Sequence, residues 1–114
     1  MARPAAENSV LEPKIIACLL EVVDPEAGLS VVDLGLVYRA ERNDQGIEVA
    51  LTLTTPACPL GEMMVEDARA RLLHRFQDAP EVVVDLVWSP PWSPQRISDR
   101  GLELLGHFPL EPRP

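Results

Sequence analysis

One cysteine stands where a thiol could be chemically active. Cys58 follows an apolar run and directly precedes Pro59 and an amphipathic stretch that predicts a helix. Because proline is favoured at the first helical position, we expect Cys58 near the N-cap. There, unpaired backbone N–H groups and the helix dipole favour the thiolate, the form that binds metal or attacks an electrophile. The same position also suits a small apolar residue that only joins a strand to a helix.

Two hydroxyls and two carboxylates could complete a site around Cys58. Thr54 and Thr55 lie at the carboxyl end of a predicted strand, and hydroxyls can donate hydrogen bonds to a thiolate or to cluster sulfide. Asp24 and Glu26 occupy a predicted turn that could approach the same end. Carboxylates there would raise the thiol pKa unless a metal held both groups, so the combination favours a metal over a free nucleophile. The alternative is that Asp24 and Glu26 only end a helix.

Other residues that could do chemistry have simpler interpretations. Cys18 lies on an apolar helical stripe, so we expect a buried free thiol. Met63 and Met64 lie in the apolar pattern of the second predicted helix and are expected in the core, not as metal ligands. His74 is predicted at the surface of that helix, too far along it to act as a base for Cys58.

A proline-rich loop carries two tryptophans. Three prolines in the stretch 89–94 disfavour both helix and strand, which predicts a stiff loop. Trp88 and Trp92 flank the paired prolines of this loop. They are either packing anchors or a surface that binds a partner.

Length and composition indicate one domain. The chain has 114 residues, 46% hydrophobic and 25% charged, and we expect a domain over 9–108 between an arm at 1–8 and a tail at 109–114. The net charge of −8 argues against nucleic acid and against anionic membrane surfaces. No secretory signal or membrane-spanning run is visible. Two cysteines are too few for a disulfide framework, so we expect a reducing cytoplasm.

The periodicities predict an α/β (α+β) fold in the order helix–strand–strand–helix–strand–helix, with helices packed on a mixed sheet of at least three strands. Helices are expected over 10–23, 60–76 and 98–105, and strands over 31–42, 47–54 and 81–88. Turn residues at 43–46 predict an antiparallel hairpin. The third strand is apolar on both faces, so we expect it at the centre of the sheet. A right-handed crossover would place it parallel to the second strand.

Four collinear motifs carry a resemblance. They are Asp24-Pro25-Glu26 and the stretches 32–38, 51–60 and 87–98. Together they resemble the small iron–sulfur cluster assembly domain family, also described as metal–sulfur cluster biosynthetic proteins. The resemblance covers residues 11–107. It includes stand-alone bacterial members and one component of the phenylacetate-oxygenase operon.

The resemblance implies an α/β fold and a role in the maturation of iron–sulfur proteins. It implies that Cys58 handles iron or a cluster, and that Asp24, Glu26, Thr54 and Thr55 line one pocket with it. This chain lacks the cysteine-rich tail of the phenylacetate-type members, which disfavours their specific role. It also lacks the phosphate-binding loop of the scaffold ATPases to which some members are fused.

We therefore expect a non-catalytic factor that holds iron or an iron–sulfur cluster transiently, or docks apo-clients, through Cys58. One cysteine cannot fill the ligand positions of a cluster. Asp24, Glu26, a small thiol, the client or a second subunit in a homodimer would complete them. The expected partners are iron–sulfur scaffold or carrier proteins and apo-client proteins. The alternatives are a metal-free adaptor that uses the loop from Trp88 to Trp92, and a small thiol-dependent enzyme.

Overall fold

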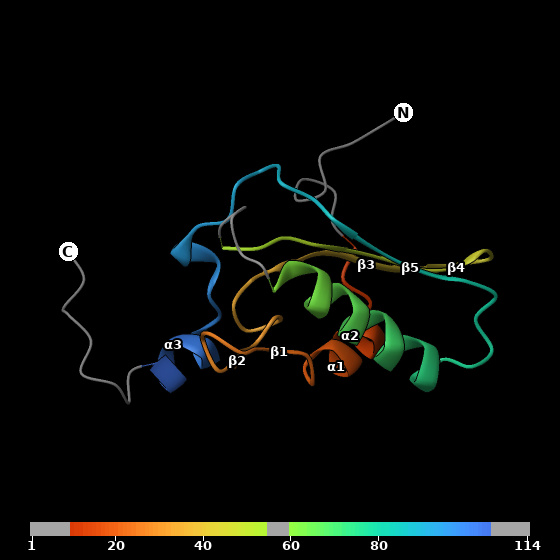
Figure 1. Ribbon diagram of the computed structural model, residues 1–114, viewed down its shortest axis with the longest axis horizontal. Helices are drawn as coiled ribbons and strands as arrows, with labels where there is room; N and C mark the ends of the chain where they lie inside the picture. Colours follow the sequence, from red (N-terminus) through yellow and green to blue (C-terminus); the bar gives the residue numbers. More distant parts are fainter. Residues whose placement is uncertain (1–9, 55–59, 106–114) are drawn as a thin grey trace.

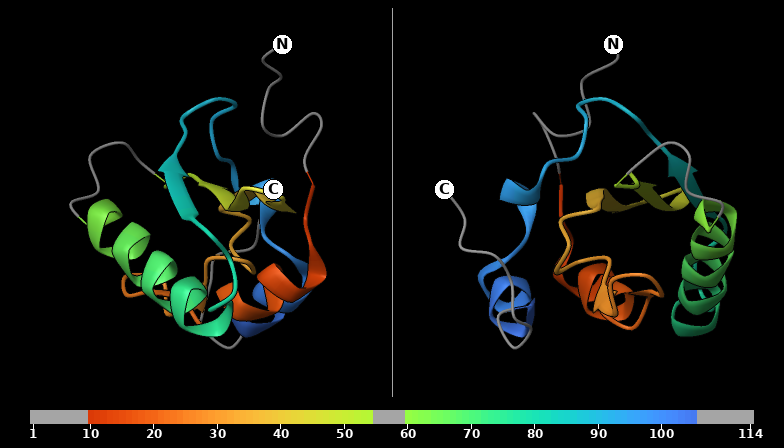
Figure 2. Two further views of the ribbon diagram at one scale, coloured as in Figure 1. Left: turned by 90° about the vertical axis from the view of Figure 1, so that its right-hand side faces the viewer. Right: turned by 60° about the vertical axis from the view of Figure 1, so that its left-hand side comes forward.

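The computed structural model describes residues 10–54 and 60–105, and these form the predicted α+β fold. The elements in chain order are α1 (Pro13–Leu19), β1 (Val23–Asp24), β2 (Leu29–Ser30), β3 (Val37–Asn43), β4 (Gly46–Leu51), α2 (Gly61–Arg75), β5 (Val82–Leu86), the 3-10 turn η1 (Pro94–Arg96) and α3 (Asp99–Leu105). Helices α1 and α2 lie along one face of the main sheet, and α3 lies toward one end of the molecule (Figures 1 and 2). The hydrophobic core lies between the main sheet and the helices α1 and α2.

The main sheet has the strand order β3-β4-β5. β3 pairs with β4 in antiparallel fashion, and β5 runs parallel to β4, which confirms the predicted hairpin and the predicted parallel pairing. The central strand is β4, so the prediction that the apolar third strand is central is wrong. β5 is apolar because one side of it packs on α2, although it lies at an edge. A second, two-stranded sheet of β1 and β2 was not predicted.

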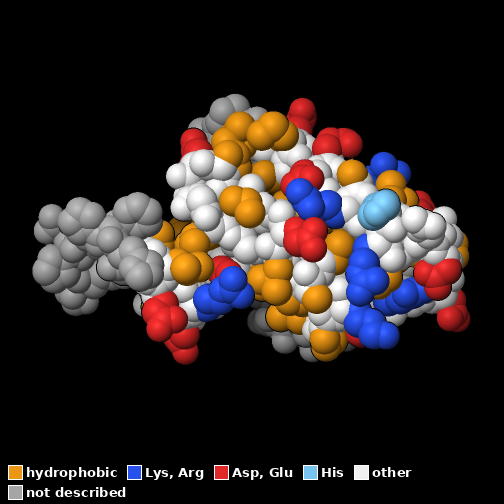
Figure 3. All heavy atoms as spheres, turned by 90° about the horizontal axis from the view of Figure 1, so that it is seen from below, with side chains coloured by type: hydrophobic (Ala, Val, Ile, Leu, Met, Phe, Trp, Pro, Cys, Tyr) orange, Lys and Arg blue, Asp and Glu red, His pale blue; other side chains and the backbone are white. Residues whose placement is uncertain are grey.

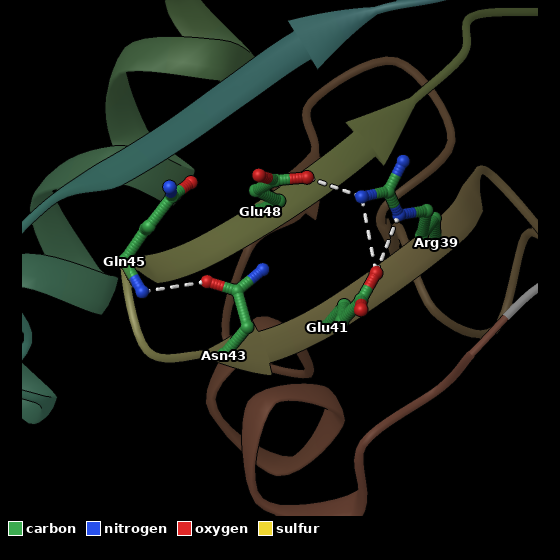
Figure 4. Close-up of polar contacts among 5 residues, drawn as sticks. All are labelled: Arg39, Glu41, Asn43, Gln45 and Glu48. Carbon is green, nitrogen blue, oxygen red and sulfur yellow. Dashed lines mark hydrogen bonds and ion pairs between the residues drawn. The ribbon is translucent and has the colours of Figure 1, made fainter. Parts of the chain in front are cut away.

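The β3–β4 hairpin separates an apolar face from a polar one. Three residues of β4 that the sequence places on one face are buried as predicted, Ile47, Val49 and Leu51, and Ala50 on the other face is buried as well. On the other face, the Arg39 guanidinium pairs with the carboxylates of Glu41 and Glu48 (Figure 4). At the turn, the Asn43 Oδ1 accepts a 2.9 Å hydrogen bond from the backbone N–H of Gln45. These half-exposed ion pairs each contribute less than about 1 kcal/mol, so burial stabilises the hairpin more than charge does.

Two boundaries near the N-terminus differ from the predictions. Helix α1, predicted to reach residue 23, ends at Leu19, because the chain turns there and Val23 enters β1. The strand predicted over 31–42 begins instead as a turn over 31–35 and continues as β3, and β2 lies just before that turn. The turn ends at Gly35, whose φ is +75°. A Cβ at that position would also overlap the backbone carbonyl of Arg96, so glycine is required.

Helix α2 buries a single stripe against the sheet. The buried positions of this stripe recur every four residues: Met64, Ala68, Leu72 and Phe76. This confirms the core prediction for Met64. The same prediction for Met63 is wrong, because its side chain is 54% exposed, and Leu73 is also 40% exposed. Each lies one position from the buried stripe, where a helix turns its side chains toward solvent.

The ends of the chain lie outside the described residues. The predicted arm at 1–8 and tail at 109–114 therefore stay predictions, as do the outermost residues of the predicted domain. Within 10–54 and 60–105, no helix has both the length and the apolar character that crossing a membrane requires.

Candidate functional site

The predicted site is built on the connection between β4 and α2. Thr55 and Cys58 lie outside the described residues, whereas Thr54 is exposed just beyond the end of β4. Helix α2 begins at Gly61, and no side chain caps its first turn in the described part of the chain. Leu60 is the N-cap residue, two positions after Cys58. As at the start of any α-helix, the first backbone N–H groups of α2 lack intrahelical partners.

Both ends of this connection are fixed in the core. Leu53 is 5% exposed, and Gly61 is buried at the start of α2. A Cβ built on Gly61 would lie 2.6 Å from the Cδ1 of Leu53 and 3.5 Å from the Cδ1 of Leu86. The start of the helix thus approaches the end of the strand so closely that a larger residue would force a shift. The sequence signal for this contact is a glycine at the second position of the predicted helix.

Asp24 holds a turn. Its carboxylate is buried, and Oδ1 accepts hydrogen bonds from the backbone N–H groups of Glu26 (2.8 Å) and Ala27 (3.3 Å). This is the structural alternative that the sequence left open, although the turn links β1 to β2 and does not end a helix. No hydrogen bond among the described residues involves Oδ2 of Asp24 or joins this turn to Thr54. The Glu26 side chain is exposed.

The two tryptophans lie in different environments. Trp92 is half-buried against the core, and its Nε1 donates a 2.7 Å hydrogen bond to the carbonyl of Leu34. Trp88 is 45% exposed just beyond the end of β5. Trp92 is therefore a packing residue, as one of the two interpretations predicts. A role of the two tryptophans in binding a partner stays a prediction, and Trp88 is the more accessible of the two. The loop is neither helix nor strand, as predicted, until the single turn η1.

Two of the four motifs contact each other directly. The Ser98 Oγ donates a 2.9 Å hydrogen bond to Oδ1 of Asp33, and the Ser98 backbone N–H donates to the Asp33 carbonyl at 2.8 Å. The Tyr38 hydroxyl donates a 2.8 Å hydrogen bond to the carbonyl of Pro90. Hydrogen bonds thus join the motif at 87–98 to the motif at 32–38. Asp33 is a buried carboxylate whose role sequence reasoning missed, because its partner is 65 residues away.

A groove of about 490 Å³ lies between α1 and α2, lined in part by Cys18, Glu21, Arg71 and His74. Figure 3 shows the face that carries these helices, with Lys and Arg side chains gathered toward the right-hand side. Burial first, and then the nearby Glu21 carboxylate, raise the pKa of the Cys18 thiol. Cys18 is therefore a buried, weakly nucleophilic thiol, as predicted, and His74 is exposed on α2, as predicted.

The described residues contain no complete metal site. Within 10–54 and 60–105, no three His, Cys, Asp or Glu side chains are placed to hold a metal ion. Because Cys58 lies outside these ranges, the ligand set of Cys58, Asp24 and Glu26 stays a prediction. Of its described members, Asp24 has one carboxylate oxygen engaged in a turn, and the Glu26 side chain is exposed.

Comparison with known protein sequences places this site in context. The Fe-S protein maturation auxiliary factor YitW of Bacillus subtilis is 38% identical over 95 residues, covering 80% of this chain and 89% of the relative. The Fe-S protein maturation auxiliary factor SufT of Staphylococcus aureus is 37% identical over 78 residues, covering 68% and 88%. An iron-sulfur cluster carrier protein of Deinococcus radiodurans is 41% identical over 60 residues, covering 53% of this chain but 17% of that protein.

Solved structures share the fold. A DUF59 domain from Bacillus anthracis superimposes with a TM-score of 0.79 and 35% identity, covering 83% of this chain and 91% of that chain. A hypothetical protein from Thermotoga maritima gives a TM-score of 0.69 and 38% identity, covering 88% and 98%. The iron-sulfur cluster assembly protein family matches residues 12–84, which include the turn at Asp24 and the whole connection from β4 to α2. The chain therefore belongs to the iron-sulfur cluster assembly protein family.

Proposed function

We propose that this protein is an iron–sulfur cluster assembly or maturation factor, not an enzyme, that acts through Cys58. It holds iron or a cluster transiently, or docks apo-client proteins. Membership of the family carries the proposal, because two bacterial relatives described above are named as maturation factors and another is named as a cluster carrier. The match covers the connection in which Cys58 lies.

The surroundings of this connection support a chemical role for Cys58. Its two ends are fixed by the close approach of Leu53 and Gly61, and the first N–H groups of α2 have no side-chain cap among the described residues. A thiol beside such N–H groups is expected to have a lowered pKa. The exposed hydroxyl of Thr54, with that of Thr55, would donate hydrogen bonds to cluster sulfide or thiolate.

The remaining ligands would come from several sources. Oδ2 of Asp24 has no hydrogen-bond partner in the described part of the chain, and the Glu26 carboxylate is exposed. Each could complete the coordination of an iron ion that Cys58 holds. A cluster needs further thiolates, which a small thiol, the client or the second Cys58 of a homodimer would provide.

The partners of this function would be iron–sulfur scaffold or carrier proteins and apo-clients in the reducing cytoplasm. The exposed Trp88 supports an alternative, a metal-free adaptor that only brings partners together. The second alternative is a thiol-dependent enzyme. Turnover of a thioester or a disulfide by the purified protein, lost in Cys58→Ser, would favour it.

Anaerobic loading with ferrous iron and sulfide tests the proposal, with the two cysteines as a matched pair. We expect Cys58→Ser to lose iron and sulfide uptake, because serine is a poor ligand for soft metals. We expect Cys18→Ala to retain uptake, since that thiol is buried between α1 and α2. Thermal unfolding of both variants controls for the fold. Equal uptake by wild type and Cys58→Ser would contradict a role for Cys58 in holding the metal.

The role of Asp24 is separable from its turn. Asp24→Asn keeps an oxygen that can accept the hydrogen bonds from Glu26 and Ala27 but removes the charge. We expect weaker iron uptake with little change in stability, whereas Asp24→Ala should also lose stability. The double variant Asp24→Asn/Cys58→Ser should be no worse than Cys58→Ser, because the two groups would act as one unit. Unchanged uptake in Asp24→Asn would remove Asp24 from the ligand set.

A further inference from the structure

The outer edge of β5 exposes backbone groups that could pair with another strand. Leu51 is the register partner of Leu86, and its carbonyl accepts a 2.8 Å hydrogen bond from the N–H of Val87. In a parallel ladder, a residue bonds to both neighbours of its register partner. The N–H and C=O groups of Leu86, and those of Val84 two residues earlier, therefore face away from β4. No hydrogen bond between described residues engages these four groups.

The start of this edge is closed by a side chain. The Arg69 Nε donates a 3.3 Å hydrogen bond to the outward-facing carbonyl of Val82. The open part of the edge thus begins after Val82 and runs toward the carboxyl end of the sheet. There it leads to the exposed Trp88, close to where β4 ends.

A groove of about 480 Å³ runs along this open edge, between β5 and α2. The apolar lining of the groove is formed by Val65, Val84 and Leu86. The acidic lining is formed by Glu62, Glu66 and Asp85. The three apolar residues are only partly buried, although they pack against the core. The three carboxylates make no ion pair with any residue in 10–54 or 60–105. The groove therefore offers backbone groups, apolar contacts and uncompensated negative charge along one line.

We propose that this edge binds an extended segment of a client or carrier protein as an added strand, and that this segment carries alternating apolar and basic side chains. An added strand would pair with the backbone of Val84 and Leu86 and place its apolar side chains over the apolar lining of the groove. Because successive side chains of a strand point to opposite faces, its Lys or Arg side chains would lie on the face of Asp85, and Glu62 and Glu66 on α2 would add negative charge along the groove. This inference rests on the proposed function, because it takes the partner to be a client or carrier brought to the connection after β4.

The charge distinguishes this occupant from a second copy of the chain. Two copies paired through their β5 edges would bring two acidic grooves together, in a chain whose net charge is −8. A basic segment has the opposite charge and is attracted to the same surface. The binding should accordingly weaken as salt is added.

The test uses the full-length, ¹⁵N-labelled protein and a synthetic six-residue peptide of alternating valine and lysine. We expect the peptide to slow hydrogen exchange of the Val84 and Leu86 amides, and a matched peptide of valine and glutamate to have no effect. Val84→Pro removes one outward N–H without removing a bond to β4, and it should weaken peptide binding at least tenfold. Binding that leaves both amides unprotected, or that survives Val84→Pro, would overturn the proposal.

A second pair of variants keeps the test independent of the proline. Glu62→Gln/Glu66→Gln should weaken binding of the lysine peptide at least threefold, whereas Asp44→Asn/Glu103→Gln makes the same charge change on exposed residues that do not line the groove and should have no effect. Equal effects of the two pairs would contradict a specific groove. Protection of the two amides that rises with protein concentration, without peptide, would show that a second copy is the occupant instead.

Failure of this inference and failure of the proposed function give different results. Cys58→Ser should bind the peptide as tightly as wild type, and Val84→Pro should take up iron normally but mature a client poorly. If Cys58→Ser matures clients normally while the peptide still protects the Val84 and Leu86 amides, the proposed function of Cys58 is wrong, whereas the proposed binding surface on β5 is still supported. If Val84→Pro matures clients as wild type does, the β5 surface is not the client's docking site.

Discussion

The indole Nε1 of Trp92 donates a 2.7 Å hydrogen bond to the backbone carbonyl of Leu34, a residue 58 positions earlier in the chain. The ring also packs against the core. This contact, together with that of Ser98 on Asp33, fastens the loop after β5 to the turn before β3. The loop is therefore part of the framework that positions the carboxyl end of the sheet.

Trp92 should matter for stability much more than Trp88. We expect Trp92→Ala to lower the free energy of unfolding by about 2–4 kcal/mol, because it removes packing and leaves the Leu34 carbonyl without its partner. Trp92→Phe keeps most of the packing and should lose about 1 kcal/mol. Trp88→Ala, at an exposed position, should stay within about 0.5 kcal/mol of wild type. Denaturant unfolding measures all three, and similar losses at both tryptophans would be inconsistent with the different environments of the two rings.

Ser98 should be a second attachment point. Its Oγ donates to the buried Asp33 carboxylate at 2.9 Å and accepts from the Gly101 N–H at 2.9 Å. Ser98→Ala leaves a buried carboxylate short of a donor, which should cost about 1–3 kcal/mol of unfolding free energy. Ser93→Ala is the control, because the Ser93 side chain caps no N–H of η1. Equal free energies of unfolding for Ser98→Ala and Ser93→Ala would show that the Ser98 hydroxyl does not contribute to stability.

The Cys18 thiol should make the protein less stable at high pH. Its pKa is raised above the ordinary value of 9.0, chiefly by burial, so the folded state holds the proton more tightly than the unfolded state. This contribution to stability is complete below about pH 9 and is lost as the pH rises toward the folded-state pKa. Cys18→Ala should therefore lose less stability than wild type between pH 8 and pH 10.5. Denaturant unfolding at each pH measures the stability of both proteins. An equal loss of stability in wild type and Cys18→Ala would exclude Cys18 as the cause.

The two cysteines should react at different rates. We expect iodoacetamide to alkylate Cys58 faster than Cys18 at pH 7, because burial and the Glu21 carboxylate raise the pKa of the Cys18 thiol. Mass spectrometry of the folded protein follows both sites. A Cys18 that reacts as fast as Cys58 would mean that Cys58 is not activated.

Local patterns in the sequence predicted much of the fold. The alternation along β4 and the turn residues after β3 identify the hairpin, because strand faces and turn chemistry depend on neighbours in the sequence. The end of α1 was not predictable in the same way, since Val23 fits a helical stripe as well as the strand β1 that it enters. The edge position of β5 depends on strand order, which a local apolar pattern does not specify.

The candidate site also combines features that local sequence patterns predict with contacts that they cannot predict. The turn at Asp24 and the glycine at the start of α2 are local signals, and in the structure the Asp24 carboxylate holds the turn and Gly61 lies close to the side chain of Leu53. The attachment of Trp92 to Leu34 and of Ser98 to Asp33 joins residues 58 and 65 positions apart. No local pattern reports such pairs, so the sequence could not separate a packing tryptophan from an exposed one.

Client maturation in cells tests the central claim most directly. A host that lacks its own copy of this protein would be supplied with wild type, Cys58→Ser or Cys18→Ala, and the activity of an iron–sulfur enzyme would be measured beside the amount of that enzyme. We predict that wild type and Cys18→Ala restore the activity and that Cys58→Ser, present at the same level, does not. Full restoration by Cys58→Ser would contradict the claim that this protein acts through Cys58.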